Sequence, residues 1–232
     1  MTTKTAVRRN FKKALPIEDV PGLCLLSGDH DERKDGVGFM EAYAWLKGLP
    51  HSDAPPCAGP AIIGLGNGLN NNLPDDKRQQ MKDLFPSMLA MAESTNELEQ
   101  VRGLMAADWL VRTFTPAWLD LTPALASQAK AIRELPEITT WDQVEASMPV
   151  LREGQRAANA ARGAALDAAR GAAWGAAWGA AWGAAWGAAW GAAWGAAWGA
   201  AWGAARARLA STISKLQDSA IDLLRRMIEA KA

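Results

Sequence analysis

Apolar residues recur every three or four positions along the first 150 residues, which is the spacing of one helix face. The first such helix is expected over 38–47, and Gly48 and Pro50 follow where a helix would end. Its apolar face is formed by Phe39, Ala42, Tyr43 and Leu46. A second helix is expected over 61–71, although its three glycines weaken it.

The pattern continues through several short helices between residues 74 and 149. A helix opens at Pro74 and is divided at Pro86, because proline removes a backbone donor and clashes with the preceding turn. Another runs to about Phe114. Thr140 and Gln143 have the spacing of a capping box, which predicts a last short helix that ends before Pro149. No stretch alternates apolar and polar residues as a strand would, so we expect an all-α protein.

A four-residue repeat takes over after Pro149. Eight Gly-Ala-Ala-Trp tetrads fill residues 171–202, and their tryptophans are Trp174, Trp178, Trp182, Trp186, Trp190, Trp194, Trp198 and Trp202. The glycines that follow the first seven tryptophans are Gly175, Gly179, Gly183, Gly187, Gly191, Gly195 and Gly199. From residue 206 an ordinary amphipathic pattern resumes. We therefore expect a helical head over 1–149 and a long helical segment over 150–232, with the repeat at 171–205 and an amphipathic helix at 206–230.

Alanine content and the helical flanks favour a helix for the tetrads over a silk-like strand. One continuous helix over 151–230 would be about 120 Å long. A helix turns by about 100° per residue, so tryptophans four residues apart form a ridge that drifts by about 40° per tetrad. A groove of glycine and alanine runs beside this ridge. Such a ridge fits the groove of a second helix at a crossing angle near −50°.

Eight indoles in water would form a large apolar surface, so the repeat is expected to pack on another surface. The head alone is too small to cover so long a helix. We therefore expect a homo-oligomer in which the tetrad tryptophans and glycines form the interface. Because identical units cannot supply the distinct groups of an active site, a non-enzymatic structural or interaction protein is predicted, with no catalytic residue.

The charge pattern bears on two other classes of partner. The chain has 25 basic and 25 acidic residues, so its balance does not favour nucleic acid. Between Arg170 and Arg206 no side chain is ionisable, which leaves a membrane-active or membrane-anchoring helix as an alternative. The even spread of tryptophan argues against it, because membrane spans concentrate this residue at the two interfaces.

One polar cluster offers a different alternative. Asp29, His30, Asp31 and Asp35 lie within seven residues and could bind a metal or another ligand in the head, with the repeat as an assembly device. The spacing does not fit an EF-hand loop, because Arg33 would stand where the third-position ligand belongs. Nucleotide-binding and hydrolase motifs are missing from the sequence, so no cofactor is expected.

Four tryptophans lie outside the repeat, at positions 45, 109, 118 and 141, and are expected in the core. The two cysteines, Cys24 and Cys57, are too few for a disulfide framework. With no secretory signal recognisable at the N-terminus, a cytoplasmic protein is expected.

Two head segments and the tetrads carry a resemblance to a known family. They are residues 24–36, CLLSGDHDERKDG, and residues 108–113, DWLVRT. With the alanine-rich tetrads, they resemble a family of bacterial and phage proteins of unknown function. Its members share a helical front half and end in Ala/Gly tetrads that often include Trp or Asp. The resemblance implies a phage or mobile-element origin and carries over no site residues.

Overall fold

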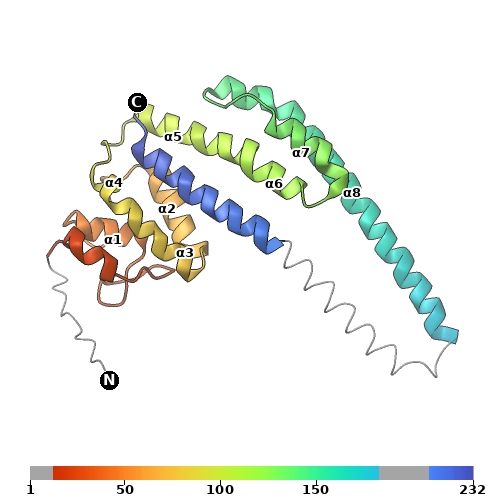
Figure 1. Cartoon of the computed structure of the whole chain (residues 1–232), viewed down its shortest axis with the longest axis horizontal. Coiled ribbons are helices and arrows are strands. Elements are labelled where there is room, and N and C mark those ends of the chain that lie inside the picture. The colour runs from red at the N-terminus through yellow and green to blue at the C-terminus, as the bar shows by residue number, and fades with distance from the viewer. Residues whose placement is uncertain (1–12, 183–208, 232) are drawn as a thin grey trace. The chain divides into compact units, whose positions relative to one another are not determined.

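The computed structural model describes residues 13–182 and 209–231, and along residues 162–182 it describes the backbone (Figure 1). In these ranges the chain forms helices and no strand, which confirms the all-α prediction. The chain divides into two units. The first unit comprises residues 1–106 and 217–232, and the second comprises residues 107–216.

The first unit is built from short helices separated by glycine and proline. In chain order they are η1 (Ile17–Gly22), α1 (Phe39–Leu46), α2 (Pro60–Asn72), α3 (Asp75–Gln80), η2 (Met81–Leu84), α4 (Phe85–Leu89) and the start of α5 (Asn96–Asp108). The helix bounds agree with the predicted ones to within one or two residues at α1 and α2. Pro86 divides η2 from α4 as predicted, because its ring cannot fit inside a continuous α-helix.

Helix α1 is buried within the first unit. All eight of its residues are buried, whereas the sequence predicted a helix buried along one face. Phe39 stacks on Phe85 of α4 with ring centroids 5.0 Å apart. Gly48 has φ of +69°, the left-handed conformation that ends a helix at low cost only in glycine. Because α1 is buried on every side, its one charged residue, Glu41, is buried as well.

The C-terminal helix, residues 209–229, completes the first unit with its second half. The buried residues from 220 onward are Ala220, Ile221, Leu223, Leu224, Met227 and Ile228, whereas Ile213, in the first half of the same helix, is 39% exposed. The long helix expected after residue 150 is described in two parts. One helix runs to Trp182 and another covers residues 209–229, and the part of the prediction over 183–208 lies outside the described residues.

The second unit begins within a long helical run. The end of α5 continues into the π-helix η3 (Trp109–Phe114) and then α6 (Thr115–Leu119). The wider π turn precedes Pro116, which cannot donate to the preceding turn. The Thr115 hydroxyl donates to the carbonyl of Leu110 at 2.8 Å. The unit continues with η4 (Pro123–Leu125), α7 (Ala126–Arg133) and α8 (Trp141–Trp182).

Helix α8 packs against η4 and α7, side by side with α7 in Figure 1. Its start is capped as predicted, since Gln143 Oε1 accepts from the Thr140 amide at 3.0 Å and the Thr140 hydroxyl accepts from the Gln143 amide at 3.3 Å. The predicted stop before Pro149 is wrong, because α8 runs through that proline. Pro149 is exposed and so is Glu145, whose carbonyl loses its helical donor to the proline ring and can be hydrated instead.

The prediction that four tryptophans lie in the core holds for one of them. Trp45 is 2% exposed, whereas Trp118 and Trp141 are 36% and 54% exposed, and Trp109 is half-buried. Trp109 and Trp118 instead flank Phe114, with ring centroids 5.4 and 6.0 Å from it. Among the described residues, no helix combines the length and the apolar character that crossing a membrane requires.

Candidate functional site

The predicted ligand loop does not gather its side chains into one site. Asp29, Asp31 and Asp35 are exposed, whereas His30 is half-buried and faces Glu41 of α1. Within residues 13–182 and 209–231, no three His, Cys, Asp or Glu side chains are arranged to hold a metal ion. Of the four predicted residues, only His30 lies in a polar cluster, and its partner Glu41 was not among the predicted residues.

Glu41 is the centre of a buried polar cluster in the first unit. Its Oε2 accepts from the Gly38 amide at 2.6 Å and from His30 Nδ1 at 2.8 Å. Its Oε1 accepts from the His30 amide at 3.0 Å and lies 3.5 Å from His51 Nε2. The cluster joins three segments, because Glu41 stands in the first turn of α1 and the two histidines lie in the loops before and after that helix.

The hydrogen bonds of this cluster indicate which ring nitrogen of each histidine carries a hydrogen. His51 Nε2 lies 2.7 Å from the His30 carbonyl, which can only accept, so this nitrogen carries a proton. His30 Nδ1 donates to the Glu41 carboxylate by the same reasoning. The remaining His51 nitrogen, Nδ1, is buried and has no hydrogen-bond partner among the residues that the structure describes.

The backbone around His30 leaves little room for a substrate. Gly36 has φ of +140°, and a Cβ at this position would lie 2.9 Å from His30 Cδ2 and 2.5 Å from Leu26 Cδ1. The loop is thus closed on the imidazole ring by its own chain. The buried carboxylate of Glu41 therefore holds the loop on α1 by hydrogen bonds, which is a structural role.

A second buried polar cluster ties two helix ends to α5. Glu99 Oε2 accepts from the Ala61 amide at 2.9 Å, in the first turn of α2, where a negative charge is favoured. Arg102 is fully buried, and its Nη1 pairs with Glu99 Oε1 at 2.7 Å. Its Nε donates to the carbonyl of Met227 at 2.9 Å, in the last turn of the C-terminal helix, where a positive charge is favoured. One ion pair therefore anchors both helices.

Two pKa shifts accompany this cluster. Burial raises the pKa of Glu99, but hydrogen bonds from the Ala61 amide, Arg102 and Ser94 outweigh it and leave the pKa below its usual value. Burial raises the pKa of Tyr43 far above its usual value, and its hydrogen bond with Cys57 adds to the effect. Both cysteines are free thiols.

The sequence analysis missed Glu41, Glu99 and Arg102, although each had a signal. Glu41 stands in the first turn of a predicted helix, where an acid is favoured by its position alone. Glu99 and Arg102 are three residues apart, a spacing that fits an exposed surface pair equally well. A surface pair and an interior pair differ in their burial. Burial depends on contacts with helices that are distant in sequence.

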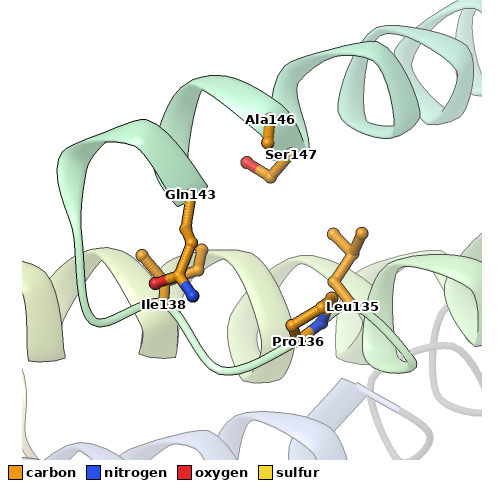
Figure 2. A pocket seen from close by; sticks show the side chains of 6 residues that line it. All are labelled: Leu135, Pro136, Ile138, Gln143, Ala146 and Ser147. Carbon is orange, nitrogen blue, oxygen red and sulfur yellow. The ribbon is translucent and has the colours of Figure 1, made fainter.

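A small apolar pocket lies in the second unit between the start of α8 and the segment that precedes it. Figure 2 shows Gln143, Ala146 and Ser147 of α8 across from Leu135, Pro136 and Ile138. Its volume of about 80 Å³ is well below the range of about 300–1,000 Å³ typical of small-molecule sites. The Ser147 hydroxyl donates to the Val144 carbonyl at 2.6 Å and so is engaged within its own helix.

The predicted interface residues of the repeat fall into two groups. Trp174, Trp178 and Trp182 stand at four-residue spacing in α8, with Gly175 and Gly179 between them. The remaining five tryptophans and the glycines from 183 to 199 lie outside the described residues. Comparison of the chain with protein-family models, curated proteins and solved structures finds no match.

Proposed function

We propose that this protein is a non-enzymatic structural protein that self-associates through its tetrad helix. The proposal rests on one observation, the length of α8 compared with the helices that pack on it. At 42 residues, α8 is about 63 Å long, whereas α7 has 8 residues and is about 12 Å long. The three residues of η4 add about 6 Å. Together α7 and η4 match less than a third of the length of α8.

The packing contacts that the structure describes for α8 within the second unit lie in its first part, before the tetrads. Buried residues recur along α8 at Ser147 and Gly154, on the face toward α7. A Cβ on Gly154 would lie 3.1 Å from Ile132 Cδ1 and 3.7 Å from Leu119 Cδ1, so the helices approach closely there. The first tetrad starts at residue 171, which is about 26 Å further along the helix.

The chemistry of the tetrads fits a second helix of the same kind. In helical geometry Trp174, Trp178 and Trp182 form one ridge, and Gly175 and Gly179 line the adjacent groove. A tryptophan can bury on the order of 200 Å² of apolar surface, and glycine lets a partner backbone approach. Every copy of the chain carries both the ridge and the groove. We therefore propose that the tetrads of one chain pack on the tetrads of another chain.

The metal- or ligand-binding alternative has less support. The three aspartates of the loop are exposed, and His30 is engaged by Glu41. Of the His30 imidazole, only Nε2 would then be available to a metal, because Nδ1 donates to Glu41. Metal analysis of the purified protein decides between the two functions. If the protein is structural, no bound metal is expected to be lost on Asp31→Ala.

The test is a tryptophan replacement in the three described tetrads. W174A/W178A/W182A should weaken association at least tenfold, or about 1.4 kcal/mol, because three ridge residues are removed. The matched control is W118A/W141A, which removes two exposed tryptophans outside the repeat. Sedimentation equilibrium of both variants supplies the dissociation constants. Equal effects from the two variants would contradict the proposal.

A further inference from the structure

The part of the C-terminal helix from residue 217 onward occupies its place in the first unit. Its covalent connection to the rest of that unit runs through residues 107–216, which belong to the second unit and include the first residues of the helix. The residues that receive it lie between 1 and 106. In this respect the first unit contains a binding site for an amphipathic helix, and the chain supplies the helix from its far end.

Two polar contacts fix the position of the helix in this site. Lys77 Nζ pairs with Asp218 Oδ1 at 2.6 Å near one end, and Arg102 Nε donates to the Met227 carbonyl at 2.9 Å near the other. Between them the apolar side chains face inward, and Leu224 is fully buried. The site therefore favours an amphipathic helix with an acid opposite Lys77, and Arg102 binds a backbone carbonyl of its last turn.

The opposite face of the helix is suited to water. Asp222 pairs with Arg225 at 3.3 Å and with Arg226 at 3.1 Å, and all three side chains are about half exposed. These pairs lie at the three- and four-residue spacings that support a helix without tertiary contacts. These pairs lie within the helix itself, so they are kept whichever copy of the site the helix occupies.

We propose that copies of this chain exchange their C-terminal helices, so that the site in the first unit of one copy binds the helix of a second copy. The proposal rests on the proposed function, because association of the tetrads brings together the segments that directly precede the helix in two chains. Exchange requires no new interface, since the exchanged helix makes the same contacts with Lys77 and Arg102. Tetrad association raises the effective concentration of the second helix at the site.

The test uses full-length chains with C24S and C57S, so that engineered cysteines are the only thiols. Chains carrying K77C are mixed with chains carrying D218C, refolded together from urea and treated with a short bismaleimide. We expect a covalent heterodimer. One chain carrying both K77C and D218C is the positive control for proximity. The negative control pairs K77C with R226C, a position on the exposed face of the helix.

Exchange is overturned if the doubly substituted chain cross-links internally while the mixed chains give no heterodimer, or give no more than the R226C control. Sedimentation of the same mixture separates this failure from that of the proposed function. A large particle without the heterodimer leaves self-association standing and removes exchange. A particle with the mass of one chain, without the heterodimer, removes both.

Discussion

The two helices on either side of residues 183–208 are held in different ways. The C-terminal helix has six buried residues from 220 onward, an ion pair at Asp218 and a hydrogen bond from Arg102 to its last turn. Helix α8 is twice as long, and the helices that pack on it match only its first part. The C-terminal helix thus has its partner within the chain. Helix α8 extends well beyond the length of α7 and η4, and for its tetrads we propose a second chain as the partner.

The largest effect is expected at Arg102. Arg102→Ala leaves Glu99 without its cation and the Met227 carbonyl without its donor, which should cost about 3–5 kcal/mol of the free energy of unfolding. Urea denaturation measures the change. Arg226→Ala, on the exposed face of the same helix, should stay within about 0.5 kcal/mol. Similar losses for both variants would mean that the C-terminal helix is not anchored at Arg102.

The next effect tests the packed stretch of α8. Gly154→Leu places a branched side chain against Ile132 and Leu119, and we expect a loss of about 1–3 kcal/mol from overpacking. Ala160→Leu, at an exposed position two turns further along, is the control and should be neutral. Thermal unfolding followed by circular dichroism compares the two. If Gly154→Leu is also neutral, α8 does not pack closely on α7.

A smaller effect is expected from pH. The pKa of Glu99 is lowered in the folded protein, so its contribution to stability is present above the unfolded-state pKa and is lost as the pH falls through the folded-state value. The stability of the protein should therefore fall below about pH 4.5, the ordinary value for this group. Glu99→Gln should flatten this part of the profile. An unchanged acid limb in E99Q would show that Glu99 is not responsible.

The smallest effect is expected on the outer face of α8. Trp141 is 54% exposed, so Trp141→Ala should change the free energy of unfolding by no more than about 0.5 kcal/mol. Trp45→Ala, which empties a buried position, should cost about 3–5 kcal/mol in the same assay. A large loss for Trp141 would mean that this side chain has a partner.

Local pattern predicted the helices well where the interactions that decide them are local. The left-handed glycine after α1, the Thr140–Gln143 capping box and the break at Pro86 all depend on residues within one or two turns. The predicted stop at Pro149 failed, because the packing of α8 on α7 outweighs the loss of one hydrogen bond at an exposed turn.

The buried clusters could not be predicted in the same way. His30 has two aspartates beside it in sequence, yet its partner is Glu41, eleven residues away. Arg102 meets Met227 across 125 positions of the chain. A charged residue on a helix is expected in solvent, and the fold alone brings it a partner that makes burial tolerable. The division at residue 149 and the tetrad interface stay predictions.

The mass of the full-length protein in solution tests most directly whether the tetrads associate with a second chain, as we propose. One chain has a mass of 24.8 kDa. Sedimentation equilibrium over a range of concentrations should give a mass that rises above this value toward a multiple of it. A particle of 24.8 kDa at every concentration would contradict the account.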